Sequence, residues 1–298
     1  MKMKPENLLT EFDNRGSRLL EMLETCRTSP DVDAIHDLRV SIRRYLAATD
    51  ALEQLAGQVI LSNKSRKTLK SLLDSYDEVR DLQVMIGDLS SEPEIFLSES
   101  QFLNWLKARE SGSSELQFTV AESKSAAMAK IHTNAIQKAR RVLKKLPPAA
   151  VEELLDKVFK RNRKLASATR ADDPPTIHKL RIAFKRFRYS VEFFASHLGA
   201  PAELFPRLRA YQTALGKVQD ASVLIDTMDQ FEAEDPANQL TKPERGFAQN
   251  RLKETIEDFM NQREKLDTFW RKNHSSPIPW QEVSSSDLNQ FINKLKPS

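Results

Sequence analysis

The sequence predicts an all-α protein built from two four-helix bundles that are related by internal duplication. The 298 residues include only seven glycines, and 30 % of them are charged, which is typical of long helices rather than of β or α/β folds. A helical segment in which a histidine is followed by three or four cations occurs twice, and no segment has a convincing β-hairpin pattern. The chain is long enough to bury a large core.

The repeat lies in two segments whose histidines are 142 residues apart. Residues 35–45 read IHDLRVSIRRY, and residues 177–189 read IHKLRIAFKRFRY. The alignment superimposes one histidine and three cations, pairing His36 with His178, Arg39 with Arg181, Arg43 with Lys185, and Arg44 with Arg186. An internal repeat of this kind predicts that the fold consists of two similar halves.

Each segment has two faces, because successive residues of a helix are rotated by about 100°. The polar faces are cationic and carry His36, Arg39, Arg43 and the flanking Arg44 in the first copy, and His178, Arg181, Lys185 and Arg188 in the second. The opposite faces are apolar. The sequence therefore predicts two amphipathic helices that bury one side and present cations on the other.

The similarity extends beyond these helices. VRDLQVM (79–85) aligns with the end of LGKVQDASVL (215–224), so that Asp81 meets Asp220, and Lys70 meets Arg209 in the same register. Arg80 has no cationic counterpart. Asp81 and Asp220 either pair with the cations of the histidine helices or are ordinary surface carboxylates, and the sequence leaves both interpretations open.

Prolines delimit the predicted helices. Pro30 precedes the first histidine helix, and Pro174 and Pro175 begin the second after the possible caps Asp172 and Asp173. The expected helices cover residues 4–28, 33–56, 61–88, 95–145 with a break at 111–114, 149–170, 175–198, 202–232 and 243–273. The predicted domain spans 1–274, with bundles at 1–146 and 147–274, and residues 275–298 form a C-terminal appendage.

Charge is distributed unevenly, although the net charge is only +4. Residues 124–188 contain 18 Lys or Arg but 5 Asp or Glu, which indicates an anionic partner. The single cysteine excludes an intramolecular disulfide. No signal peptide or membrane-spanning segment is recognisable, so we expect a soluble protein of the reducing cytoplasm that has no membrane partner.

The sequence contains no pattern typical of catalysis. A glycine-rich phosphate loop, a Ser or Cys nucleophile motif and an acidic cluster suited to magnesium are all missing. Neither His36 nor His178 has a second ligand at metal-binding spacing. We therefore expect no enzymatic activity, no cofactor and no metal.

These motifs resemble the CHAD family, the conserved-histidine α-helical domain. The resemblance rests on the two histidine helices and on the VRDLQV and LGKVQDASVL segments, and it covers roughly residues 5–274. It implies two four-helix bundles around a basic central groove or pore that binds inorganic polyphosphate, in some members at polyphosphate granules. Two positions differ from the family pattern, because Leu46 and Gln219 stand where arginine is expected.

Together, the repeat and the resemblance predict one set of polyphosphate-binding residues. They are His36, Arg39, Arg43, Arg44, Lys70, Arg80, His178, Arg181, Lys185, Arg186, Arg188 and Arg209. Several alternatives remain: a nucleic-acid-binding protein, an enzyme acting on polyphosphate, a helical scaffold for an acidic protein tail, or a merely solvated basic surface. The oligomeric state is not predicted.

Overall fold

The structure is a computed structural model that describes residues 5–29, 31–147 and 149–281, with the side chains of residues 78 and 112–125 excepted. Within these ranges the protein is helical and forms no strand, so the all-α prediction is confirmed. None of the described helices combines the length and apolar character needed to span a membrane.

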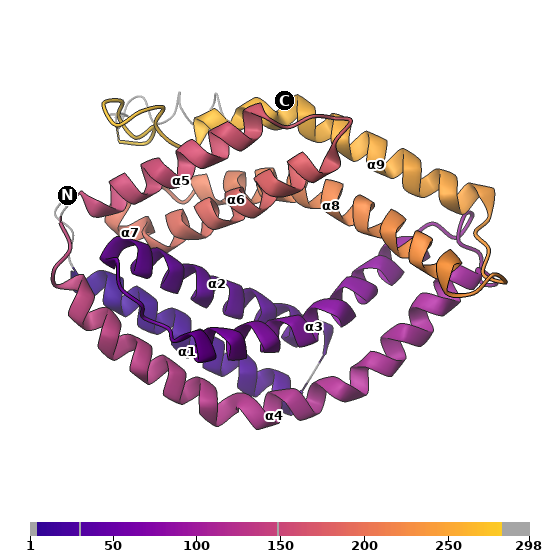
Figure 1. The fold of residues 1–298 in the computed structure, drawn as a ribbon, viewed down its shortest axis with the longest axis horizontal. Helices are drawn as coiled ribbons and strands as arrows, with labels where there is room; N and C mark the ends of the chain where they lie inside the picture. The colour runs from indigo at the N-terminus through magenta and orange to yellow at the C-terminus, as the bar shows by residue number, and fades with distance from the viewer. Residues whose placement is uncertain (1–4, 30, 148, 282–298) are drawn as a thin grey trace. The chain divides into compact units, whose positions relative to one another are not determined.

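The helices follow the order that the proline positions predict (Figure 1). They are α1 (Pro5–Thr28), α2 (Val32–Ala56), α3 (Asn63–Ser90), α4 (Gln101–Leu143), α5 (Ala150–Ser167), α6 (Pro174–Phe193), α7 (Ala195–Leu198), α8 (Leu204–Glu234), α9 (Lys242–Gln262) and the 3-10 helix η1 (Arg263–Thr268).

The described residues form two compact units, each containing one histidine helix. The α2 unit comprises residues 8–146 and 221–252, and the α6 unit comprises residues 147–220 and 253–281 together with 5–7. The chain changes unit near residue 147, where the sequence predicts a boundary. Because α8 and α9 each contribute residues to both units, the predicted halves 1–146 and 147–274 do not coincide with the units. The internal duplication stays a prediction.

The predicted break at residues 111–114 is wrong, because α4 runs without interruption from Gln101 to Leu143. One glycine in a helix interior costs only about 1 kcal/mol relative to alanine, which the flanking helical residues outweigh. The helix starts later than predicted, at Gln101, and Ser100 is its N-cap. The hydroxyl of this residue accepts a hydrogen bond from the backbone N–H of Leu103 at 3.2 Å and donates one to Glu244 at 2.5 Å.

The two histidine helices begin in different ways. In α2, the Asp31 carboxylate accepts a hydrogen bond from the Ala34 N–H at 2.7 Å, and Gly57 ends the helix with a φ of 61°. In α6, Asp173 is at the N-cap position but makes no capping bond with its side chain. Its carboxylate instead forms an ion pair with Arg170 at 3.0 Å. The predicted side-chain cap of α6 by Asp173 is therefore wrong.

The apolar side of α2 packs around a polar chain inside the α2 unit. Tyr45 stacks on Phe12 of α1, with ring centroids 5.2 Å apart. The Tyr45 hydroxyl lies 3.2 Å from Nδ1 of His132 on α4, and Nε2 of the same ring lies 3.0 Å from Asp13. His132 therefore connects α1, α2 and α4 and has a structural role, which sequence reasoning did not assign.

A second apolar cluster of the α2 unit joins α3 and α4 to the parts of α8 and α9 that belong to this unit. Its buried members include Leu89, Phe102, Leu106, Met228 and Phe231. Phe102 and Phe231 meet edge to face at 5.4 Å, an arrangement that favours aromatic pairs.

Aromatic rings dominate the core of the α6 unit. Phe184 and Phe187 of α6 are fully buried, and Phe187 packs on Phe159 of α5 with centroids 5.0 Å apart. Phe184 packs on Tyr211 of α8 at 4.6 Å. The apolar face predicted for the second histidine helix is thus confirmed as the side that packs in the core.

Gly16 allows α1 to approach α4, because a Cβ atom at this position would overlap the ring of His132. We expect Gly16→Ala to destabilise the protein by about 1–3 kcal/mol, the usual cost of overpacking. Gly87→Ala is the matched control, because no atom lies within 4 Å of a Cβ there, and it should stabilise by up to about 1 kcal/mol. Urea denaturation measures both, and equal effects would contradict this account.

Candidate anion-binding site

The polar side of α2 lies against α3, and the two helices are antiparallel along their contact. Arg39 contacts Asp77 and Asp81, and Arg43, further along α2, contacts the first of these two acids. Arg80 is close enough to influence the charge of His36. Residue numbers therefore increase on α2 as they decrease on α3, which places the cations of α2 opposite a defined stretch of α3.

Asp77 is the centre of this contact. Its Oδ1 accepts a hydrogen bond from Arg39 Nε at 2.7 Å, and Arg43 Nη2 donates to its two oxygens at 3.0 and 3.1 Å. Arg39 Nη2 also donates to Asp81 at 3.3 Å. The Arg39 side chain is only 7 % exposed, so this cation of the polar face is buried against α3. A buried guanidinium requires charged partners, and α3 supplies them.

Sequence reasoning identified Asp81 but missed Asp77. The signal was present, because Lys70, Asp74, Asp77 and Asp81 are spaced by four, three and four residues and share one stripe of α3. Lys70 is exposed at one end of that stripe, and Asp77 is half-buried. Three acidic residues therefore accompany the cations of α2. The exposed Arg44 lies on the flank of α2, as predicted.

His36 experiences the positive charge around it. Partial desolvation of its ring, then Arg80, and then Arg39 and Arg43 hold the pKa of His36 below its ordinary value, while Asp37 opposes the shift. The imidazole is therefore neutral at pH 7. A bound anion would reverse this preference, because it stabilises the imidazolium.

In the α6 unit, α6 and α8 lie in the same antiparallel register. His178 Nδ1 makes a short hydrogen bond with Gln219 Oε1, and Phe184 packs on Tyr211. Interpolation between these two contacts places Arg181 opposite Leu215, the residue before Gly216. His178 and Gln219 occupy the positions that His36 and Arg80 occupy in the sequence alignment.

The α6 face combines cations with few acids. Arg181 and Lys185 are half-buried, while Arg186 and Arg209 are exposed. The stripe of α8 that corresponds to the acidic stripe of α3 reads Arg209, Thr213, Gly216 and Asp220. Only one of its four positions is acidic, so this face has less compensating charge than the α2 face.

Arg188 does not lie where the sequence predicts. It is buried, forms an ion pair with Glu192 one turn later at 3.3 Å, and its guanidinium covers the Tyr189 ring at 4.6 Å. A position seven residues after Arg181 is on the same stripe of the helix, but here α6 enters the core. The structure therefore separates Arg188 from the exposed cations of the face.

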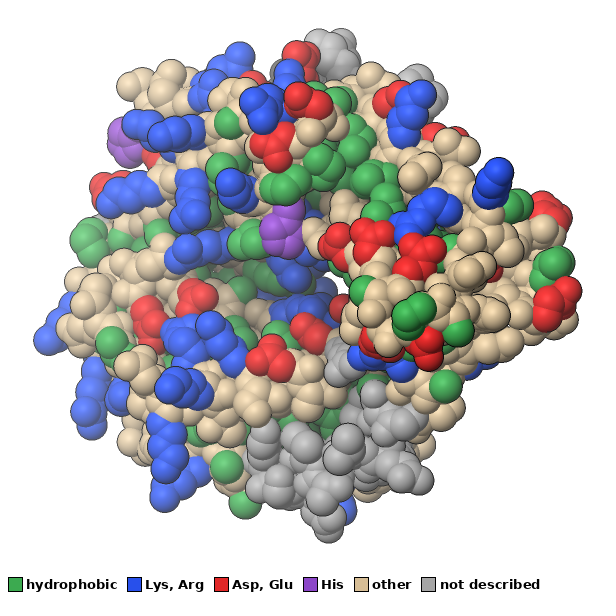
Figure 2. All heavy atoms as spheres, turned by 45° about the vertical axis from the view of Figure 1, so that its right-hand side comes forward, with side chains coloured by type: hydrophobic (Ala, Val, Ile, Leu, Met, Phe, Trp, Pro, Cys, Tyr) green, Lys and Arg blue, Asp and Glu red, His purple; other side chains and the backbone are tan. Residues whose placement is uncertain are grey.

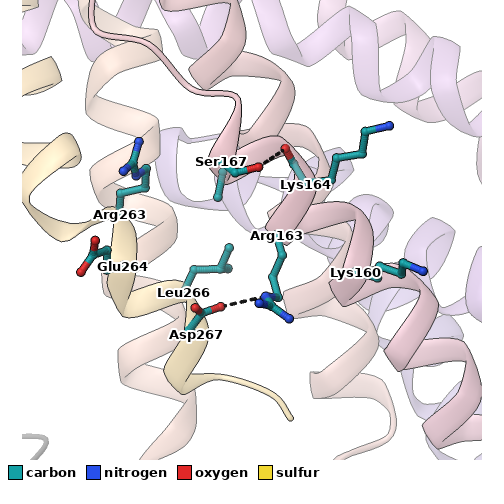
Figure 3. Close-up of a pocket in the computed structure, with 9 residues that line it drawn as sticks. Lys160, Arg163, Lys164, Ser167, Arg263, Glu264, Leu266 and Asp267 are labelled. Carbon is teal, nitrogen blue, oxygen red and sulfur yellow. Dashed lines mark hydrogen bonds and ion pairs between the residues drawn. The ribbon is translucent and has the colours of Figure 1, made fainter. Parts of the chain in front are cut away.

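A cleft of about 420 Å³ lies elsewhere in the α6 unit, between α5 and η1 (Figure 3), and none of the predicted site residues lines it. Arg163 spans it, with its Nε 3.1 Å from Asp267 and its Nη1 donating to the Lys272 carbonyl at 3.0 Å. Lys160 and Lys164 extend away from η1. The ion pair of Arg163 therefore occupies the centre of the cleft.

Charged side chains are unevenly distributed on the face that Figure 2 draws. Figure 2 shows lysine and arginine side chains gathered over the left part of the face in view, and a group of acidic side chains in its right part. Among the described residues, no group of three His, Cys, Asp or Glu side chains forms a potential metal site. No Phe, Tyr or Trp occurs among the large hydrophobic side chains that are exposed in this part of the chain.

Comparison with known proteins identifies the same family as the motifs. The CHAD domain profile matches residues 13–229. The crystal structure of the CHAD domain from the plant Ricinus communis superimposes with a TM-score of 0.68 at 17 % identity, covering 87 % of this chain and 91 % of that one. PptA from Streptomyces chartreusis gives 0.52 at 19 % identity, covering 88 % and 95 %. The comparison with curated proteins finds no match.

The contact between Arg39 and Asp77 should be measurable as a coupling energy. In a double-mutant cycle of Arg39→Ala and Asp77→Ala, we expect a coupling of about 1–3 kcal/mol in the free energy of unfolding. The control pair is Arg18 and Glu21, which is 52 % and 60 % exposed and should couple by less than about 0.5 kcal/mol. Similar coupling in the two pairs would show that Asp77 does not hold Arg39 in place.

Proposed function

Because the chain belongs to the CHAD domain family, we propose that it binds inorganic polyphosphate through the basic faces of α2 and α6. The observation that carries this proposal is the α6 face. There Arg181, Lys185, Arg186 and Arg209 accompany His178, and the neighbouring stripe of α8 has one acidic position. Such a face is electrostatically unfavourable by itself and favourable with an anion bound.

Polyphosphate suits this arrangement. It is a flexible chain that carries one negative charge per internal unit, and cations at helical spacing meet successive phosphates along it. Arginine donates forked, charge-assisted hydrogen bonds to phosphate oxygens, whereas lysine contributes a point charge. His178 contributes a ring nitrogen beside these cations.

The family association with polyphosphate supports this ligand over nucleic acid. Single-stranded nucleic acids are usually held by aromatic side chains on which the bases stack. Tyr189, which follows the basic residues of α6, is buried and is covered by the guanidinium of Arg188. We further propose binding without hydrolysis, and recruitment to polyphosphate granules where such granules occur.

The first test is a titration with polyphosphates of several lengths at two salt concentrations. The logarithm of the binding constant should fall with the logarithm of salt concentration by roughly 0.7 per phosphate contact, as for single-stranded nucleic acids. Arg181→Ala/Arg186→Ala should weaken binding about 100-fold or more, because each charge-assisted contact contributes about 1.5–3 kcal/mol.

Lys160→Ala/Lys164→Ala is the matched control, since it removes two charges from the same unit and leaves α6 intact. It should change binding only slightly, and circular dichroism should show that both variants remain helical. Equal losses would mean that net charge alone attracts the polymer. Competition by single-stranded DNA at equal charge would favour the nucleic-acid alternative, and phosphate release with a divalent metal would favour an enzyme.

Binding should also depend on pH through His36. The pKa of this residue is lowered in the free protein, and a bound phosphate raises it, so the complex takes up a proton. Affinity should therefore increase as pH falls through the interval between the lower pKa of the free protein and the higher pKa of the complex. Within that interval the gain is at most about tenfold per pH unit.

Calorimetry between about pH 5.5 and 7.5, in buffers with different heats of ionisation, measures this proton uptake. His36→Gln should remove part of it. His274→Gln is the control, because His274 pairs with Asp156 and lies outside both basic faces. Unchanged proton uptake in His36→Gln would contradict a phosphate contact at this histidine.

A further inference from the structure

The two basic faces differ in the acids that accompany them. On the α2 side, the neighbouring stripe of α3 reads Lys70, Asp74, Asp77 and Asp81. In the corresponding stripe of α8, threonine and glycine replace the two central acids, because Thr213 aligns with Asp74 and Gly216 aligns with Asp77. The cationic ends of the two stripes, Lys70 and Arg209, are equivalent.

Asp77 already occupies the position that an anion would take on α2. It receives three hydrogen bonds from Arg39 and Arg43, all between 2.7 and 3.1 Å. The two guanidinium groups therefore direct these donors toward a carboxylate of the protein itself. A phosphate that approached them would meet a negative charge at close range, and repulsion between like charges at such distances is strong near a partly buried site.

The α6 face has no such occupant at this position. Gly216 aligns with Asp77 in the sequence, and it follows Leu215, the residue opposite Arg181 in the register set by the contacts of His178 with Gln219 and of Phe184 with Tyr211. Within the described part of the chain, no acidic side chain lies within ion-pair distance of Arg181. Nothing lies within 4 Å of a Cβ built on Gly216, so there is open space beside the helix.

We infer that the two faces are unequal anion sites, with the α6 face binding short polyphosphates and Asp77 keeping them from the α2 face. This inference rests on the proposed function. It adds that the two basic faces respond differently to the chain length of the polyphosphate. A short polyphosphate such as tripolyphosphate can satisfy only a few cations, so it binds beside Arg181, which no acidic side chain of the described residues already engages. The α2 face contributes only when a longer polymer offers several phosphates to the remaining cations, such as Lys70 and Arg80.

The test places an aspartate at the position on the α6 face that corresponds to Asp77. Gly216→Asp introduces at the α6 face the carboxylate that Asp77 provides at the α2 face, and the open space around Gly216 accommodates it. Aspartate is at least as compatible with a helix as glycine. Gly87→Asp on α3 is the matched control, because it adds the same charge at another helical glycine with nothing within 4 Å.

Tripolyphosphate is titrated into the parent and both variants at constant salt concentration. Gly216→Asp should weaken binding by at least about tenfold, the loss expected for one charge-assisted contact. Gly87→Asp should change it by less than about twofold, in keeping with an exposed charge outside the site. Equal affinities of the two variants would overturn the inference.

Asp77→Asn is the reciprocal variant, because it removes the charge and keeps the shape of the side chain. The parent should bind one tripolyphosphate, and Asp77→Asn should bind two. A parent that binds two equivalent tripolyphosphates, or an Asp77→Asn variant that still binds one, would also overturn the inference. A parent that binds neither tripolyphosphate nor long polyphosphate would instead refute the proposed function itself.

Discussion

The α2 unit depends on the compensation of like charges by carboxylates of α3, chiefly that of Asp77. Arg39 and Arg43 are one turn apart on α2, and their mutual repulsion would oppose the approach of any neighbouring helix. Asp77 accepts hydrogen bonds from both, which allows α2 to pack on α3 with the Arg39 side chain almost fully buried. The position of α2, and with it the orientation of its cations, therefore depends on a residue of α3.

The opposite side of α2 is held by a different set of contacts. Tyr45 lies between Phe12 and His132, and His132 reaches Asp13, so that an aromatic stack and a polar chain connect three helices. Buried polar groups of this kind stabilise a fold when their partners are present. The close approach around His132 is possible because α1 has a glycine there. The cations of α2 are thus presented by a helix that is held on both sides.

In the α6 unit, α6 and α8 have the same antiparallel register as α2 and α3, but different side chains meet in it. His178 pairs with a neutral glutamine where His36 is close to Arg80, and Arg188 is compensated by Glu192 and Tyr189 within its own helix. Solved structures with 17 % and 19 % identity share the fold, because helix packing needs only apolar residues at the right spacing. Charged positions can then change independently of the fold, as the contrast between Asp77 and Gly216 shows within one chain.

The helices of this protein and the two faces of its histidine helices could be predicted from the sequence alone. The paucity of glycine and the proline positions predicted the helices, and apolar residues on the sides opposite the cations, such as Leu38 and Phe184, are fully buried. These predictions succeed because helical periodicity is local, so residues three and four apart always share a face. The cationic stripes of α2 and α6 were predictable for the same reason.

The tertiary structure decided which of these cations are exposed. Arg39 and Arg188 have the same local spacing as their exposed neighbours, yet the first is paired by α3 and the second enters the core. The role of Asp77 follows from the antiparallel register of α2 and α3, and the role of His132 follows from a contact 87 residues away in the chain. These roles depend on which helices pack together and in what register. The periodicity of a single helix contains no information about its neighbour.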